Sequence, residues 1–176
     1  MTDSFFFDSD CISAFLWVNN QNILSQLYSG KIIIPKQAYN ELSYPTTPHL
    51  KQRIDTLIQS GDAEIFDMKI DSEEYKLFIK MTTAPDDNYK IIGDGEAASI
   101  ALAKEYNGVI ASNNLKDIAY YISKYNLDHI TTGDILVEAL SKGLITESQG
   151  NTIWASMIAK RRKLGATTFS DYLKNK

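Results

Sequence analysis

Four well-separated segments carry acidic or amide side chains, and the first three place them where an apolar strand-like run ends or a helix begins. The segments contain Asp8 in FFFDSD, Glu41 after KIIIPKQAYN, Glu96 in GDGEAASIALA, and Asn113, Asn114 and Asp117 in VIASNNLKDI. Carboxylates that gather at one place repel one another unless a divalent cation neutralises them. The pattern therefore predicts a metal-dependent hydrolase.

Alternating strands and helices must position these side chains. Short apolar runs predict strands at residues 5–7, 31–34, 63–70 (an edge strand), 108–111 and 129–132. Apolar spacing and turn residues predict helices at 11–18, 23–28, 50–58, 73–81, 94–106, 115–124, 134–142 and 147–164. A further helix is predicted to begin at Pro35, and residues 84–89 are predicted to form a polar loop. This order indicates an α/β fold, a three-layer α/β/α domain with a mainly parallel central sheet. Ligands of such sheets bind beyond the carboxyl ends of the strands.

Length and composition indicate one ordinary globular domain. Residues 1–176 form this single domain, with residues 145–176 as a C-terminal helix and tail, and no apolar run is long enough to span a membrane. The first residues lack a secretory signal, and the lone Cys11 cannot form an internal disulfide, so we expect a cytoplasmic protein. The net charge of −4 argues against nucleic-acid binding through bulk positive charge, but clustered metal-binding acids contribute to that sum.

Each candidate acid also has an ordinary structural interpretation. Asp8 could cap the helix that begins near Cys11, although Asp10 is better placed for that role. Glu41 taken alone is typical of a helix surface, and Glu96 in a first helical turn favours the helix macrodipole. A purely structural role for Glu96 is less well supported, because the helix that follows it consists largely of small and apolar residues, which indicates close packing. Gly93 and Gly95 would also allow a close approach of the backbone.

The remaining polar motifs narrow the kinds of site that the chain can contain. Asn113 and Asn114 could be a turn or an N-cap as readily as oxygen ligands of a hard cation. The basic run at residues 160–163 could be the solvated last turn of a helix or a phosphate-contacting patch. His49 and His129 lie far from other ligand types, so neither a zinc site nor a histidine-based triad is indicated. GDGEAA does not match a dinucleotide or P-loop fingerprint.

Taken together, these motifs resemble the PIN-domain family, the metal-dependent ribonuclease fold of many toxin–antitoxin toxins. The resemblance covers nearly the whole chain: FFFDSD, IIIPKQAYNEL, GEAASIALA and VIASNNLKDI follow one another in the family's order, and TTGDILVEALSKGLIT resembles the end of one PIN subgroup. Many family members carry aspartate at one or both positions that match Asn113 and Asn114. Some relatives instead have an asparagine pair followed by an acid, which Asp117 matches.

The resemblance implies a toxin-type endoribonuclease. Asp8, Glu41, Glu96 and Asp117 would be the catalytic residues and, with Asn114, would hold Mg²⁺ or Mn²⁺, one ion well and a second weakly, with Ser112 as a further positioning group. The expected partners are an RNA substrate, a cognate antitoxin protein and a second copy of the chain, with no membrane partner.

Two other function classes compete with this interpretation. Asp8-Ser9-Asp10 and the later GDGE are similar to motifs of haloacid-dehalogenase-type phosphatases, but Ile12 and the residues after Glu96 do not match that family, and it leaves Glu41 unexplained. The second alternative is a PIN-like module with a weakened site that binds RNA or a protein without cutting.

Overall fold

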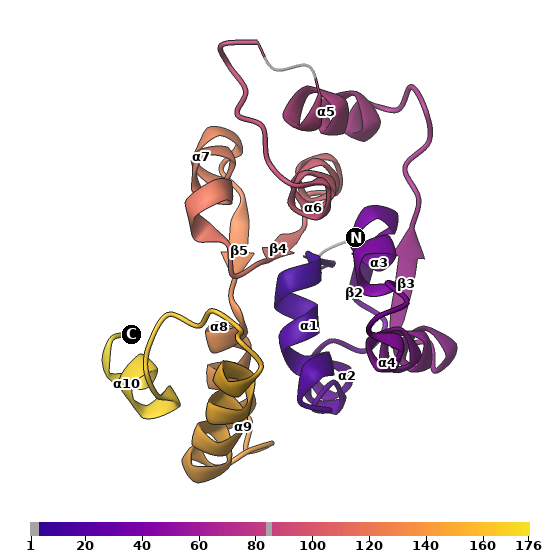
Figure 1. Cartoon of the computed structure of the whole chain (residues 1–176). Coiled ribbons are helices and arrows are strands. Elements are labelled where there is room, and N and C mark those ends of the chain that lie inside the picture. Colours follow the sequence, from indigo (N-terminus) through magenta and orange to yellow (C-terminus); the bar gives the residue numbers. More distant parts are fainter. Residues whose placement is uncertain (1–3, 84–85) are drawn as a thin grey trace.

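Short runs of mostly aromatic and aliphatic residues form one parallel sheet at the centre of the molecule (Figure 1). The computed structural model describes residues 4–83 and 86–176. Within these residues the strand order is β3-β2-β1-β4-β5, and every pairing is parallel. The strands are β1 (Phe5–Phe7), β2 (Ile32–Pro35), β3 (Ala63–Phe66), β4 (Val109–Ala111) and β5 (Asp128–Ile130). The predicted α/β fold with a parallel central sheet is confirmed.

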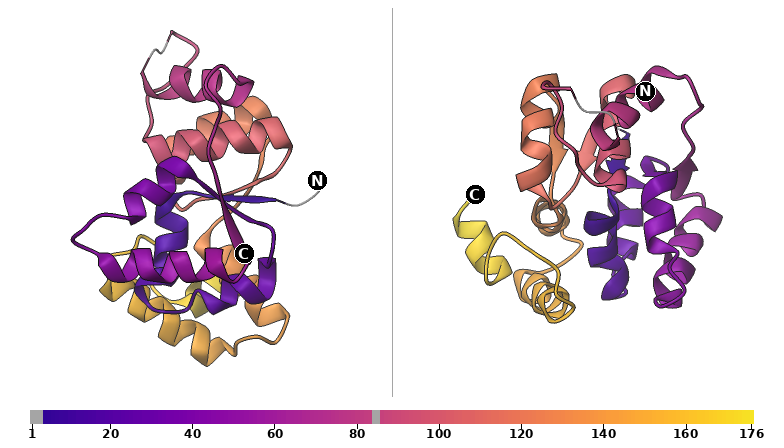
Figure 2. Two further views of the ribbon diagram at one scale, coloured as in Figure 1. Left: turned by 90° about the vertical axis from the view of Figure 1, so that its right-hand side faces the viewer. Right: turned by 45° about the horizontal axis from the view of Figure 1, so that its top comes forward.

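Helices cover both faces of the sheet, as the views in Figures 1 and 2 show. Successive strand residues point to opposite faces, so Phe6 and Phe7 lie in two different core clusters. The face of Phe6 is covered by α5 (Glu73–Thr82), α6 (Asp94–Tyr106) and α7 (Leu115–Tyr125). The face of Phe7 is covered by α1 (Ser9–Trp17), α2 (Asn22–Tyr28), α3 (Lys36–Leu42), α4 (Pro48–Gln59), α8 (Thr132–Ser141), α9 (Glu147–Ala159) and α10 (Phe169–Lys174). Over the described residues, no helix has the length and apolar character needed to cross a membrane.

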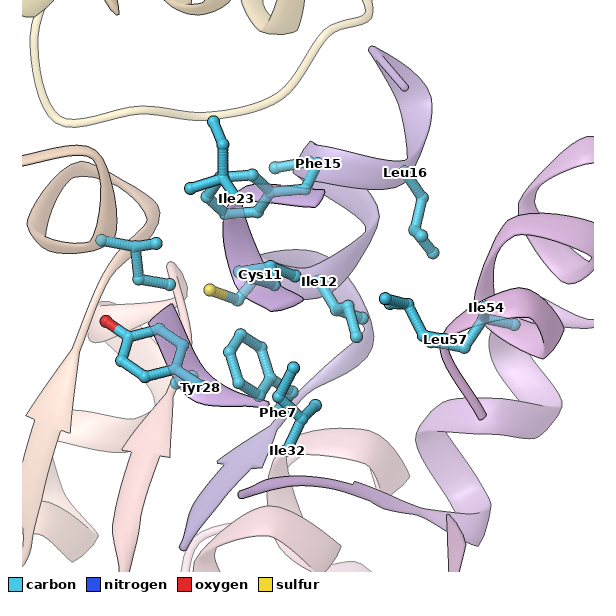
Figure 3. Packing of buried hydrophobic residues seen from close by; sticks show 14 of the residues in the cluster. Phe7, Cys11, Ile12, Phe15, Leu16, Ile23, Tyr28, Ile32, Ile54 and Leu57 are labelled. Atoms are coloured by element: carbon cyan, nitrogen blue, oxygen red, sulfur yellow. The ribbon is translucent and has the colours of Figure 1, made fainter. Parts of the chain in front are cut away.

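Helix α1 lies deep in the core, and this fixes the residue that precedes it. Its side chains Cys11, Ile12 and Phe15 are fully buried. Figure 3 shows them between α4, which contributes Ile54 and Leu57, and the side chains of α2. Burying a large aliphatic or aromatic side chain contributes about 1.5–3 kcal/mol to folding. The start of α1 is therefore held against the sheet by packing on several sides.

The carboxyl ends of β1 and β4 meet at the point where the strand order reverses. The chain proceeds from β1 to β2 and β3 on one side and from β4 to β5 on the other. The backbone N–H of Asp8 donates to the carbonyl of Ala111 at 3.0 Å, which places the residues after both strands side by side. A switch point of this kind is the usual ligand site of an open parallel sheet.

Three predicted elements end two or more residues earlier in the structure, and others differ by one or two residues at an end. The edge strand predicted at 63–70 stops at Phe66, and the strand predicted at 129–132 ends at Ile130, because Thr131 and Asp134 form a capping box that begins α8. The predicted helix 147–164 ends at Ala159, and α10 was not predicted. Of the polar loop predicted at 84–89, residues 84–85 lie outside the described part of the chain.

Candidate active site

Asp8 lies at the floor of the candidate site. It is 1% exposed and is the N-cap of α1, since its Oδ1 accepts the Cys11 N–H at 2.7 Å. The expectation that Asp10 is the better cap was wrong, because the helix begins at Ser9 and Asp10 already lies in its first turn. Among the described residues, no group makes a hydrogen bond to the buried Oδ2 of Asp8. A cap uses one carboxylate oxygen and leaves the other available to a ligand.

Burial also changes the protonation of Asp8. Loss of solvation is the largest cause that raises its pKa, from 3.8 to about 8. The Ser112 hydroxyl and the Cys11 N–H oppose the rise, whereas the charges of Asp10 and Glu96 add to it. The Ser112 hydroxyl is close enough to the carboxyl to lower its pKa, but it does not form a hydrogen bond of normal geometry to Oδ2. At neutral pH the carboxyl is therefore mostly protonated, and a bound cation would displace that proton.

Glu41 reaches the amino end of α6 from α3. Its Oε1 accepts the Gly95 N–H at 3.2 Å, and its Oε2 accepts a hydrogen bond from the Ser9 hydroxyl. A Cβ atom on residue 95 would lie 3.0 Å from Oε2 of Glu41, so glycine permits this approach. Although Glu41 as a whole is exposed, desolvation of its carboxyl group is the largest cause that raises its pKa, and the Glu96 charge adds to it. Two acids far apart in sequence thus influence each other.

Asn114 joins the other two acids. Its Nδ2 donates to Oε1 of Glu96 at 3.0 Å and to Oδ2 of Asp117 at 2.7 Å. The Glu96 side chain folds back over Gly93, where an added Cβ would lie 2.3 Å from Oε2. The amide nitrogen of Asn114 thus lies between two carboxylates, and rotation of the amide would turn its oxygen toward them.

The neighbouring Asn113 has a structural role that the sequence did not reveal. Its Oδ1 accepts the Thr132 N–H at 2.9 Å, and its Nδ2 donates to the Thr132 hydroxyl at 2.8 Å. These two bonds tie the end of β4 to the start of α8. Both polar groups of the amide are used by Thr132, so Asn113 helps to hold the frame of the site.

A cleft of about 540 Å³ opens beside these residues and is lined by side chains of both charges. Its acids are Asp10, Glu96 and Asp117, and its cations are Lys116, Arg161, Arg162 and Lys163. Oδ1 of Asp10 lies 3.5 Å from the Arg162 guanidinium. A second cleft of about 320 Å³ shares Asp10 and Arg162 and extends to Glu41, Trp17 and Tyr44.

The basic run lies beyond the end of the helix that was predicted to include it. Of its two interpretations, a last helical turn or a phosphate-contacting patch, the first is wrong, because α9 ends at Ala159 with Lys160 as its C-cap and the run continues beyond the helix. The density of charge in this run is the signal that distinguishes it, since one cation in the last turn is enough to complement the helix dipole.

The donor set fits a hard divalent cation in its chemistry. Carboxylate and amide oxygens are the ligands of Mg²⁺ and Mn²⁺, and Oδ2 of Asp8 is a buried oxygen without a hydrogen-bond donor in the described chain. Within residues 4–83 and 86–176, no lysine or arginine forms an ion pair with Asp8, Glu41, Glu96 or Asp117. In the same residues, no three Asp, Glu, His or Cys side chains converge closely enough to hold an ion as they stand. A cation would therefore have to draw the carboxylates inward.

Comparisons with known proteins agree with this architecture. The family model described as "DUF3368: PIN domain" matches residues 4–175. The "T. brucei RRP44 PIN domain" structure superposes with a TM-score of 0.51 at 11% identity, over 82% of this chain and 83% of that chain. The VapBC2 structure "from Rickettsia felis bound to a DNA fragment from their promoter" gives a TM-score of 0.48 at 17% identity, over 72% of this chain and 97% of that chain. No curated protein sequence matches the chain.

Proposed function

The chain belongs to the PIN-domain family, and from this premise we propose that it is a divalent-metal-dependent endoribonuclease of the toxin type. The observation that carries the proposal is the orphan Oδ2 of Asp8, together with the hydrogen bonds that link Glu41 to the amino end of α6 and, through Asn114, Glu96 to Asp117. The motifs resemble the PIN family more fully than the haloacid-dehalogenase-type phosphatases, and Asp10, the general acid of a phosphatase, pairs with Arg162 instead.

In this proposal Asp8, Glu41, Glu96, Asp117 and Asn114 hold Mg²⁺ or Mn²⁺. When bound, the cation supplies a Lewis acid that polarises the scissile phosphate and stabilises charge on the leaving oxygen. The chain's own residues orient the individual carboxylates. The Cys11 N–H fixes Oδ1 of Asp8 and leaves Oδ2 to bind. Gly95 and Ser9 orient Glu41, and Asn114 keeps Glu96 and Asp117 side by side.

Removal of the Asp8 charge tests the proposal. We expect Asp8→Asn to lower Mn²⁺-dependent RNA cleavage by on the order of 100-fold or more. The fold should persist, because an amide oxygen can still accept the Cys11 N–H. Cleavage of a labelled RNA and thermal unfolding are measured for both proteins, with Asp67→Asn as an exposed matched control on a loop after β3. Cleavage by Asp8→Asn at the wild-type rate would contradict the proposal, as would wild-type cleavage that survives a chelator.

The partners follow from the same family resemblance. We propose RNA as the substrate, a cognate antitoxin protein as the inhibitor, a second copy of the chain as a further partner, and the cytoplasm as the location. The free, buried Cys11 is compatible with a reducing compartment. If the chain is a toxin, its expression alone should stop growth and co-expression of the adjacent gene should restore growth. Unimpaired growth with active protein would argue against the toxin role.

One observation favours a second candidate, a PIN-fold RNA-binding module without cleavage. Residues 113 and 114 are amides, and Asn113 is occupied by Thr132, so the fourth segment contributes only the exposed Asp117 as a charge. This candidate predicts RNA binding with no cleavage at any Mn²⁺ concentration. Metal-dependent turnover by the wild-type protein would rule it out.

A further inference from the structure

The basic segment that follows α9, residues Lys160–Lys163, is not explained by the metal site. Arg161, Arg162 and Lys163 all line the cleft that contains Glu96 and Asp117, and Lys116 lines it from α7. The segment belongs to the connection between α9 and α10 (Figure 1). Cations and carboxylates from separate parts of the chain thus share one cleft.

Arg162 anchors this segment to the domain. Its side chain is 24% exposed, its Nη1 lies 3.5 Å from Oδ1 of Asp10 and 3.4 Å from the Ser13 hydroxyl, and its guanidinium lies 5.9 Å from the Trp17 ring centre. These contacts all go to α1, the helix that Asp8 caps. The segment therefore has a fixed position relative to the acids.

Arg161 and Lys163, on either side of this anchor, are exposed and form no ion pair with any described residue. Arg161 also has a left-handed backbone with φ of 61°. Its N–H donates to the carbonyl of Ile158 and the Arg162 N–H donates to that of Met157, the pattern of a helix end that usually carries glycine at this position. An arginine at a position that favours glycine brings a charge at a cost in backbone energy.

We propose that Arg161 and Lys163 form a phosphate-binding wall that holds single-stranded RNA beside the carboxylates. The inference rests on the proposed function, because RNA is its ligand. A divalent cation bound to the carboxylates of the cleft would neutralise their charge. The RNA backbone would then lie between these carboxylates and the basic side chains. Arg162 acts as the positioning residue, since its head group is already engaged by Asp10 and Ser13.

Salt-dependent RNA binding tests this proposal. A fluorescently labelled single-stranded RNA is titrated with the full chain in chelator at several KCl concentrations, so that metal-dependent cleavage does not interfere. Each phosphate contact to a single strand contributes about 0.7 to the slope of log affinity against log salt. The double variant Arg161→Gln with Lys163→Gln should therefore lower the slope by about 1.4 and weaken binding to every sequence alike.

Two controls separate this wall from net charge. The double variant Arg161→Lys with Lys163→Arg should keep the wild-type slope. The double variant Lys80→Gln with Lys104→Gln loses the same charge outside the cleft and should also keep the slope, because Lys80 lies in α5 beside Tyr89 and Lys104 lies in the last turn of α6 beside Tyr125. An unchanged slope in the Arg161 and Lys163 glutamine variant, or an equal loss in the Lys80 and Lys104 variant, would overturn the proposal.

A third variant distinguishes binding from a structural role. Arg161→Gly should raise the melting temperature, because glycine adopts the left-handed backbone without strain, and it should still weaken RNA binding. A lower melting temperature with unchanged RNA affinity would show that Arg161 serves the fold instead. Cleavage assays with Mn²⁺ are run in parallel to distinguish the two proposals. If the variants change RNA binding but the wild-type protein does not cleave RNA, only the proposed nuclease function is rejected. If the wild-type protein cleaves RNA but the variants leave the salt slope unchanged, only the phosphate-binding wall is rejected.

Discussion

At the scale of single residues, the buried carboxyl of Asp8 couples protonation to the stability of the fold. Its pKa is about 8 in the folded chain against 3.8 for the free side chain. The folded state therefore binds the proton more tightly than the unfolded state between these two values. It follows that this residue makes the fold less stable as the pH rises through that window.

We predict that the free energy of unfolding, measured in chelator, falls as the pH rises from about 4 toward about 8. The contribution of one such carboxyl approaches about 1.4 kcal/mol per pH unit. Asp8→Asn removes it and should flatten the profile, which urea unfolding at a series of pH values would show. Glu41 and Asp10 also have raised pKa values, so the difference between the two proteins is the quantity to compare. Parallel profiles would contradict the assigned pKa.

The residue types of the site were predictable, but their pairings were not. The apolar run before Asp8 and the small-residue helix after Glu96 both indicated groups near the sheet edge. Asn113 could not be assigned, because its partner Thr132 lies nineteen residues farther along the chain and belongs to another helix. Local sequence gives no sign of such a contact.

At the scale of elements, the amino end of α6 lets two of the acids lie close to its backbone. Gly95 lies under the Glu41 carboxylate, and Gly93 lies under that of Glu96. The sequence indicated a close approach at both glycines, and the structure shows which acid each one admits. The end of α9 was harder to predict, because Lys160 to Lys163 are acceptable helix formers and only the packing beyond Ala159 decides where the helix stops.

We predict that Gly95→Ala separates activity from stability. Alanine favours the helix by up to about 1 kcal/mol relative to glycine, whereas its Cβ would lie 3.0–3.3 Å from the Glu41 carboxyl atoms and push them away. RNA cleavage should fall by on the order of 10–100-fold, with unfolding by urea little changed. Wild-type cleavage by this variant would mean that the place of Glu41 is unimportant.

At the scale of the whole molecule, the last helix holds the basic wall in place. Phe169 of α10 is fully buried, its ring centre lies 5.9 Å from that of Trp154 in α9, and it packs on Gly150. The segment with Arg161 and Lys163 joins these two helices. Sequence patterns missed α10 because it is only six residues long, and its burial depends on a partner helix.

We predict that Phe169→Ala destabilises the fold by about 3–5 kcal/mol. The loss of the α9–α10 contact should also loosen the basic segment, so RNA affinity in chelator should fall at a temperature where the variant is still folded. Tyr172→Phe, which keeps the ring of a neighbouring residue and removes only a hydroxyl, is the control for binding. RNA affinity that is unaffected by Phe169→Ala would show that the basic segment holds its position without α10.

In the proposed function, Asp8 and Glu96 belong to one metal centre, although they lie 88 residues apart in the chain. A crystal soaked in Mn²⁺ tests it most directly, because the anomalous signal locates the ion independently of any activity. We predict a peak between Oδ2 of Asp8 and the Glu96 carboxylate, with the Asn114 amide turned to present its oxygen. No peak at that place at millimolar Mn²⁺ would contradict the claim.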